Sequence, residues 1–541
     1  MPAYALALAA LVTAPLLGPG YLLLRDAVST PRSYLSDAAL GLSESAPRAL
    51  PQDFLVAVAS TVLDGGVVVK ALLVAGLWLA GWGAARLVAF VVPEAGMPGQ
   101  FVAVTLAIWN PYVAERLLQG HWSLLVGYGC LPWVALAVLR LRSGSDSWAA
   151  VWPLVFWMAL AGLTPTGLML AATVAVVCVF AAGSRPRWLV AIVSLGISVF
   201  AALPWLVAAL LAGTLSSSQA AGVRAFAARA EPGLGTLGSL ASLGGIWNGE
   251  AVPASRTTLF AVVGAFVLLA VVAVGLPVVL RRRAAVPLLV LAAVAVVVPA
   301  LMATGPGLAM VESVVRTLPG LGVLRDAQKW VALAMSGYAL AGAAAVVTMR
   351  RWLPTAATAL VCCAALRAVL PDLAWGVGGK VVAVHYPSSW YTAAATINAD
   401  PRPVAVLPPD NMRHFPWAGD APVLDPLPRW VRADVLSTGD LTVGGTTVPG
   451  EGDRARAVQA MLLSGASSED LARAGVGWVV VESGDDVTVR RIGGDQPAAS
   501  GRGVMIAAHL VWLAMLVCGA VAMAVGRLRR SDIRFSRVNT R

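Results

Sequence analysis

The chain has 541 residues, of which 58% are hydrophobic and only 12% are charged, and its formal net charge is +11. Soluble globular proteins are roughly 45–50% apolar and about 25% charged, so this composition excludes a soluble enzyme and a disordered chain. The five cysteines all lie inside apolar stretches, which excludes a disulfide framework and argues against a thiolate metal site. The composition indicates a polytopic membrane protein.

Apolar windows close to the ~20 residues that a helix needs to cross a bilayer recur about twelve times. They fall near residues 3–24, 66–92, 99–118, 122–140, 148–163, 165–183, 188–212, 257–280, 286–304, 330–349, 353–370 and 503–526. The first window is too long for the core of a signal peptide and has no Lys or Arg before it, so we expect an uncleaved first span.

Short arginine clusters mark alternate connections between these windows. They lie at 140–142, 185–187, 281–283, 350–351 and 527–530. Positive charge concentrates on the cytoplasmic side of a membrane, so these connections and both termini are expected in the cytoplasm of a multi-pass plasma-membrane protein. Basic residues in this arrangement anchor a membrane protein and do not indicate nucleic-acid binding.

The opposite connections are longer and are expected to be extracytoplasmic. They cover residues 25–65, 213–256, 305–329 and 371–502. The last contains 15 acidic and 11 basic residues and short β-like runs at 381–384, 403–407 and 477–481. We predict a multispanning membrane domain over 1–370, a small extracytoplasmic α/β domain over 371–502, a final transmembrane helix over 503–526 and a basic cytoplasmic tail over 527–541.

The first candidate site is Arg25-Asp26, directly after the first window. An aspartate at the outer membrane surface has the chemistry to accept a proton from an attacking sugar hydroxyl, as a general base does. The alternative interpretation is that the two residues only end the helix at the interface.

The second candidate site lies where Asn-Pro interrupts the 99–118 window and polar residues follow. We expect these side chains to line a cavity, because a proline inside a membrane helix frees a carbonyl that polar groups then satisfy. The candidates are Asn110, Tyr112, Glu115, Gln119, His121 and Trp122. The alternative is a kinked helix with an interfacial ion pair. A metal at His121 is disfavoured because no second ligand stands at ligand spacing.

The third candidate site is the pair Arg325 and Lys329, which are four residues apart at the expected outer end of a helix. Cations at a helix N-terminus suit a phosphate group, whereas the alternative is that both side chains reach for the interface. The sequence contains no P-loop, HExxH motif or nucleophile elbow, which counts against an ATP-driven pump, a zinc protease and an α/β-hydrolase.

Taken together, these features resemble the GT-C superfold of polyprenyl-phosphate-sugar-dependent glycosyltransferases. More narrowly, the chain is similar to the membrane region of actinobacterial arabinofuranosyltransferases, which build the arabinan of cell-wall arabinogalactan and of lipoarabinomannan. The likeness is carried by Arg25-Asp26, Asn110-Pro111-Tyr112-Val113-Ala114-Glu115-Arg116, Gly120-His121-Trp122, Thr164-Pro165-Thr166-Gly167 and Arg325-Asp326-Ala327-Gln328-Lys329-Trp330.

The resemblance implies transfer of a sugar, with arabinofuranose favoured, from a polyprenyl-phosphate donor to a cell-envelope glycan or glycolipid by inverting single displacement. It implies an acidic residue of the first outer loop as base and cations that hold the donor phosphate. Asp26 matches the base, with Asp37 and Asp53 as fallbacks. The cations are Arg325 and Lys329, with Arg25 and Arg116 as helpers.

No cofactor or metal site is predicted, although the question whether a divalent cation takes part stays open. The expected partners are the lipid-linked donor, the acceptor and the bilayer. Three alternatives stay open: a mannosyltransferase that uses polyprenyl-phosphate mannose, a non-catalytic envelope scaffold, and a transporter of lipid-linked sugars. The transporter is disfavoured because polar clusters gather at the outer ends of the windows and no internal repeat is evident.

Overall fold

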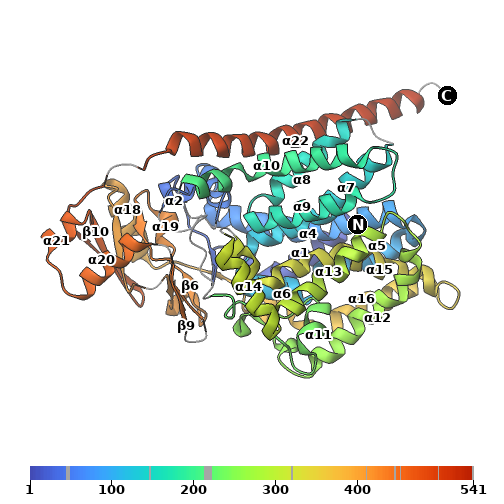
Figure 1. Ribbon diagram of the computed structural model, residues 1–541, viewed down its shortest axis with the longest axis horizontal. Coiled ribbons are helices and arrows are strands. Elements are labelled where there is room, and N and C mark those ends of the chain that lie inside the picture. The colour runs from blue at the N-terminus through green and yellow to red at the C-terminus, as the bar shows by residue number, and fades with distance from the viewer. Residues whose placement is uncertain are drawn as a thin grey trace.

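The computed structural model describes residues 1–43, 49–144, 148–211, 222–318, 321–409, 411–443, 446–450, 452–496 and 499–538. Parts of each predicted outer loop, and the last three residues of the predicted tail, therefore lie outside the described residues. Figure 1 shows a long helical body with a smaller part of mixed helices and strands at one end, and a final helix that runs along the body.

Most of the longer helices of the body fall in the apolar windows. The helices of the body are α1 (Pro2–Thr13), α2 (Asp37–Leu40), α3 (Gln52–Ala59), α4 (Gly65–Val91), α5 (Gly96–Ile108), α6 (Pro111–Leu118), α7 (Trp122–Ser143), α8 (Val151–Ala161), α9 (Pro165–Val179), α10 (Arg187–Leu211), α11 (Gly235–Ala241), α12 (Phe260–Leu280), α13 (Val286–Met302), α14 (Gly305–Thr317), α15 (Ala334–Met349), α16 (Thr355–Ala368), α17 (Ala374–Gly379) and α22 (Arg502–Val538). Of these, α2, α3, α11, α14 and α17 fall in predicted outer loops.

Among the described residues, six helices are long and apolar enough to cross a membrane, or up to eight if each of two bent pairs counts as one span. The six are Gly65–Val91, Trp122–Ser143, Arg187–Leu211, Phe260–Leu280, Ala327–Met349 and Arg502–Gly526. The predicted helical, multi-pass class is therefore confirmed, while the count of about twelve spans is not.

The prediction that the first window forms a single span was wrong. Helix α1 ends at Thr13, a short turn covers Ala14–Leu16, and strand β1 occupies Tyr21–Leu24. Pro15 and the Gly-Pro-Gly at 18–20 explain the break, because proline lacks an amide hydrogen and glycine favours a turn. The chain therefore leaves the helix early and enters a sheet.

Two further boundaries differ from the expectation. The 99–118 window consists of two helices, because Asn110 is extended and caps α6 by accepting a hydrogen bond from the Val113 amide at 3.1 Å. Helix α22 continues to Val538, so the segment predicted as a tail after residue 526 begins as part of the same helix.

Close helix packing in the body depends on glycine. Helices α4 and α7 meet at Gly76 and Gly129, where a Cβ atom on Gly129 would lie 2.2 Å from the Gly76 carbonyl oxygen. Small residues let two helix backbones approach in this way. Helix α7 is consequently the most enclosed of the six candidate spans, with 94% of its apolar window buried.

The α/β part contains most of the strands. They are β3 (Ala383–Val384), β4 (Val404–Leu407), β5 (Met412–Arg413), β6 (Val423–Leu424), β7 (Val435–Leu436), β8 (Leu441–Val443), β9 (Thr446–Val448), β10 (Trp478–Ser483) and β11 (Asp486–Arg491). Its helices are α18 (Ser388–Ala399), α19 (Leu427–Trp430), α20 (Asp453–Leu463) and α21 (Ser468–Arg473). The predicted strands at 403–407 and 477–481 correspond to β4 and β10.

A four-stranded sheet in the order β11-β10-β4-β7 forms the centre of this part. Strands β10, β4 and β7 are parallel and β11 is antiparallel to β10. Alternate side chains of β4 face opposite layers: Val404 and Val406 pack with α18, and Ala405 packs with α20 and α21. The arrangement is a layered α/β structure, and the boundaries 371 and 502 of an independent domain stay a prediction.

Strand β1 joins this α/β part to the helical body. It pairs with β3 on one side and with β2 (Ala27–Val28) on the other. The next residue, Arg25, donates its amide hydrogen to the Pro422 carbonyl at 2.8 Å and accepts from the Leu424 amide at 2.8 Å. Asp26 therefore lies at the junction of the two parts.

Candidate functional site

Asp26 occupies the tip of a tight hairpin. Leu24 and Ala27 are paired across β1 and β2, so Arg25 and Asp26 form the two-residue turn. Arg25 has a φ of +48°, in the left-handed region that such a turn requires. The Asp26 amide donates to the Gln119 carbonyl at 3.2 Å. The turn is thus held by the α/β part and by the end of α6.

Gly120 permits the contact between this hairpin and the connection from α6 to α7. Its φ is +82°, and a Cβ atom at this position would lie 2.3 Å from the Leu24 carbonyl oxygen and 2.4 Å from the Ala27 amide nitrogen. Any larger residue would separate the two segments. The close approach places Gln119 and His121 beside the Asp26 carboxylate.

The two oxygens of the Asp26 carboxylate have different surroundings. The Gln119 amide donates to Oδ2 at 2.9 Å, and His121 Nε2 lies 3.0 Å from the same oxygen. Within the described residues, Oδ1 has no hydrogen-bond partner. The Asp26 side chain is 42% exposed, so one oxygen is fixed by the protein and the other is open to a ligand.

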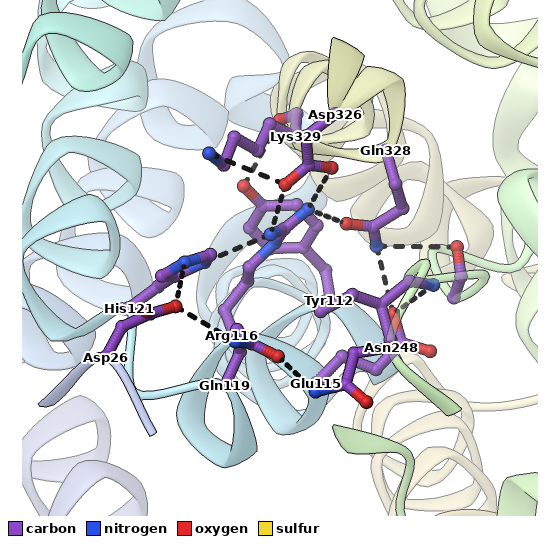
Figure 2. Close-up of polar contacts among 12 residues, drawn as sticks. Asp26, Tyr112, Glu115, Arg116, Gln119, His121, Asn248, Asp326, Gln328 and Lys329 are labelled. Atoms are coloured by element: carbon purple, nitrogen blue, oxygen red, sulfur yellow. Dashed lines mark hydrogen bonds and ion pairs between the residues drawn. The ribbon is translucent and has the colours of Figure 1, made fainter. Parts of the chain in front are cut away.

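A hydrogen-bonded chain runs inward from Asp26, as Figure 2 shows. His121 Nδ1 lies 3.0 Å from Arg116 Nη1, and both Nη atoms of Arg116 donate to the Asp326 carboxylate, at 3.0 and 3.2 Å. Arginine is a donor only, so His121 Nδ1 must accept. His121 is therefore the neutral tautomer that donates from Nε2 to Asp26.

The hydrogen bonds and charges of this hydrogen-bonded network favour an ionised Asp26. Burial on its own raises the pKa of Asp26, but the hydrogen bonds and charges of His121, Gln119 and Lys329 outweigh it and the pKa is lowered. Burial lowers the pKa of His121 more than Asp26 raises it. The pKa of Asp326 is also lowered, because Arg116 and Lys329 outweigh its burial. Asp26 is an anion and His121 is neutral at neutral pH.

Lys329 and Arg116 are cations of the network, and the side chain of Lys329 is the more exposed. Lys329 Nζ lies 3.5 Å from Asp326 Oδ2 and the side chain is 24% exposed. Its backbone carbonyl accepts from the Tyr112 hydroxyl at 3.2 Å. The Arg116 guanidinium carbon lies 5.4 Å from the centre of the Tyr112 ring. These contacts bring α6 and the segment before α15 together.

The contacts of Glu115 indicate a structural role. Its carboxylate is fully buried and accepts from the Gly245 and Ile246 amides at 3.1 and 3.2 Å and from the Gln328 amide at 3.0 Å. The Gln328 carbonyl oxygen in turn accepts from Arg116. Glu115 therefore fixes the 222–256 loop against α6, and Asn248 in that loop donates to Gln119 at 2.8 Å.

Several predicted site residues lie outside the hydrogen-bonded chain. Arg25 donates to the Leu118 carbonyl at 2.7 Å and to the Glu250 carbonyl at 3.1 Å. Arg325 donates to the Gly322 carbonyl at 3.0 Å, and its guanidinium carbon lies 5.5 Å from the centre of the Phe226 ring. The role of Arg325 at the donor phosphate stays a prediction.

The fallback acids are each paired with an arginine from a distant segment. Asp37 forms an ion pair with Arg502, and Asp53 forms one with Arg429 at 3.2 Å. These pairs attach the first outer loop to α22 and to the α/β part. They give both carboxylates a fixed structural partner, in contrast to the open oxygen of Asp26.

The other predicted lining residues are buried in the body. Asn110 caps α6, its amide also donates to the Tyr128 hydroxyl at 3.1 Å, and Trp122 begins α7 within the main apolar core. Among the described residues, no group of three or more His, Cys, Asp or Glu side chains is placed to hold a metal ion. A role for a divalent cation stays a prediction.

Asp326, Gln328 and Asn248 belong to the network around Asp26, although the sequence alone assigned them no role. Asp326 and Gln328 lie beside Lys329 in the string from 325 to 330, and an acid between the two expected phosphate-binding residues, Arg325 and Lys329, was a usable signal. Asn248 lies in the predicted outer loop 213–256, and nothing in its neighbours in the sequence indicated a contact with Gln119.

The geometry can be compared with known proteins. No protein-family model and no curated protein matches the chain. Among solved structures, the chain is similar to the cryo-EM structure of the arabinofuranosyltransferase AftD from Mycobacteria, with a TM-score of 0.57 and 18% sequence identity. The likeness covers 90% of this chain but only 35% of that one, so this chain spans about a third of its length. At this identity the comparison shows a shared fold, which supports the expected GT-C-like architecture.

Proposed function

We propose that the protein is a membrane glycosyltransferase that moves a sugar from a polyprenyl-phosphate donor to a cell-envelope glycan or glycolipid on the extracytoplasmic side. Arabinofuranose is the favoured sugar. The single observation that carries the proposal is the Asp26 carboxylate, with one oxygen held by His121 and Gln119 and the other open. The shared fold with AftD agrees with it.

In the proposed reaction, Asp26 acts as general base. An acceptor hydroxyl attacks C1 of the donor sugar while the bond from C1 to the phosphate oxygen breaks, and the phosphate leaves with the electron pair. The hydroxyl proton passes to Oδ1 of Asp26. Attack on the face opposite the phosphate inverts the anomeric centre, so no covalent enzyme intermediate is required.

Lys329 is the proposed partner of the leaving phosphate. Its charge is close enough to lower the pKa of Asp26, and its side chain is partly exposed while that of Arg116 is fully buried. Arg116 then acts indirectly, because it orients His121 and holds Asp326. Arg325 stays a second candidate for the phosphate.

The test supplies purified protein in nanodiscs with polyprenyl-phosphate arabinofuranose or polyprenyl-phosphate mannose and an arabinan or mannan oligosaccharide. We expect transfer from the arabinofuranose donor with an inverted anomeric centre. Lys329→Gln should raise the donor KM about tenfold, whereas the matched variant Arg325→Gln should raise it less. No transfer from either donor, or a retained configuration, would contradict the proposal.

A further inference from the structure

A charged cavity of about 340 Å³ lies outside the network around Asp26, where the first outer loop, the α/β part and the start of α22 meet. Its charged and aromatic lining comprises Arg32, Tyr34, Asp37, Arg432, Asp434 and Arg502. The volume is at the lower end of the roughly 300–1,000 Å³ typical of small-molecule sites. Three guanidinium groups and two carboxylates favour an anionic ligand that also carries hydroxyl groups.

Two of the arginines are held in place by the protein. Arg502 pairs with Asp37 and donates to the Leu35 carbonyl at 2.9 Å. Arg32 donates from Nη1 to the Ala57 carbonyl and to the Ser60 hydroxyl, both at 2.8 Å. These contacts hold both side chains in place before any ligand arrives.

Arg432 also lines the cavity and is available to a ligand. Its guanidinium carbon lies 5.0 Å from the centre of the Tyr34 ring, and that of Arg32 lies 5.1 Å from the same centre. Within the described residues, the exposed Arg432 side chain forms no hydrogen bond or ion pair. A guanidinium stacked on an aromatic ring keeps its donors free for a phosphate.

The cavity lies beside the ends of two candidate membrane spans. Arg502 is the first residue of one, and a Cβ atom on the preceding Gly501 would lie 3.0 Å from Leu211, the last residue of the other. Leu210 and Leu211 are 68% and 50% exposed. Apolar side chains next to a cationic cavity match a ligand that has acyl chains and an anionic headgroup.

We propose that this cavity binds the headgroup of an anionic phospholipid that carries hydroxyl groups, such as phosphatidylglycerol. Its phosphate contacts Arg432 and Arg32, its hydroxyls donate to Asp37 or Asp434, and its acyl chains lie along the ends of α10 and α22. The proposal is independent of the proposed glycosyl transfer, because no residue of the Asp26 network lines the cavity.

The test reconstitutes the full chain in nanodiscs of phosphatidylcholine, alone or mixed with phosphatidylglycerol, and counts retained lipids by native mass spectrometry after extraction in neutral detergent. Wild type should retain phosphatidylglycerol in preference to phosphatidylcholine, whose choline group the arginines repel. Arg432→Gln should lower this retention about tenfold. The control Arg490→Gln removes another exposed arginine of the α/β part and should retain lipid as wild type does.

Equal retention of the two lipids by wild type, or unchanged retention in Arg432→Gln, would overturn the proposal. A soluble probe separates the two sources of a phosphate: saturable binding of glycerol 1-phosphate without retention of phosphatidylglycerol would assign the cavity to a soluble ligand. Thermal unfolding midpoints within about one degree of wild type would show that both arginine variants are folded.

Discussion

Arg116 in the helical body and Arg413 in the α/β part are both buried next to carboxylates, but among the contacts of the described residues only the network of Arg116 reaches the surface. The network of Arg116 ends at Asp26, whose side chain is 42% exposed. Arg413 lies 2.7 Å from Glu482 and 3.8 Å from Asp425, and none of these three side chains is more than 9% exposed.

The two networks also shift carboxyl pKa values in opposite directions. The pKa of Asp26 is lowered, because His121, Gln119 and Lys329 outweigh its burial. The pKa values of Asp425 and Glu482 are raised, because burial outweighs the one arginine that both share. A buried arginine is therefore no sign of a reactive site by itself, because the same kind of pairing also occurs inside the α/β part.

The largest expected effect is a loss of transfer rate on replacement of Asp26, which replacement of another acid in the same loop should not cause. Asp26→Asn removes the proton acceptor and should lower the transfer rate by about 10²–10⁴-fold, the usual contribution of general acid–base catalysis. Asp53→Asn removes a carboxylate that is already paired with Arg429 and should change the rate less than about threefold. Transfer rates measured with a radiolabelled donor compare the two variants. An equal loss of rate in both variants would contradict the assignment of Asp26 as the general base.

Replacing the two arginines tests the contrast through stability. Arg116→Met leaves Asp326 buried and ionised, so it should lower the free energy of unfolding by about 3–5 kcal/mol. Arg413→Met should cost less, because the pKa values of Asp425 and Glu482 are raised, so these carboxyls take up a proton more readily than Asp326, whose pKa is lowered. Chemical unfolding in one detergent at neutral pH compares them. A larger cost for Arg413→Met would contradict the assigned charge states.

Two substitutions of His121 test whether its hydrogen bonds to Asp26 and Arg116 contribute to the transfer rate. Glutamine can donate an amide hydrogen to Asp26 and accept from Arg116, as the neutral imidazole does, whereas leucine can do neither. We expect His121→Gln to keep the transfer rate about tenfold above that of His121→Leu. Similar rates in the two variants, with unchanged donor KM, would show that the chain from Arg116 to Asp26 has no part in the reaction.

The smallest effect is expected at Glu482. Because its folded-state pKa is raised, wild type should lose stability as the pH rises through that pKa, where the buried carboxyl must ionise. Glu482→Gln resembles the protonated form and should change the free energy of unfolding by about 1 kcal/mol or less. It should also flatten the pH dependence. An unaltered pH dependence would indicate an ionised Glu482.

Much of the helical body follows from local sequence, because long apolar windows leave a bilayer helix few alternatives. The strands β4 and β10 were likewise visible as short β-branched runs. The first window failed because hydropathy averages over the turn at 14–20 and does not register that Tyr21–Leu24 pair with strands of a distant segment.

The site was only partly predictable. Asp26 and His121 stood out as polar residues at the ends of apolar windows, and the structure brings them into contact. Their link to Asp326 joins residues 210 positions apart at Arg116, and no local pattern specifies such a pairing. Lys329 was expected beside a phosphate, and its contact with Asp326, three residues earlier, is a local pair that the sequence could have indicated.

The most direct measurement is the pH dependence of kcat/KM for wild type and His121→Leu, since its acid limb reports the ionisation of the base in the free enzyme. With the pKa of Asp26 lowered, wild type should show no acid limb from this group above about pH 4. Without the hydrogen bond from His121, the pKa of Asp26 rises and the acid limb should move to higher pH. Identical acid limbs in the two proteins would contradict the account.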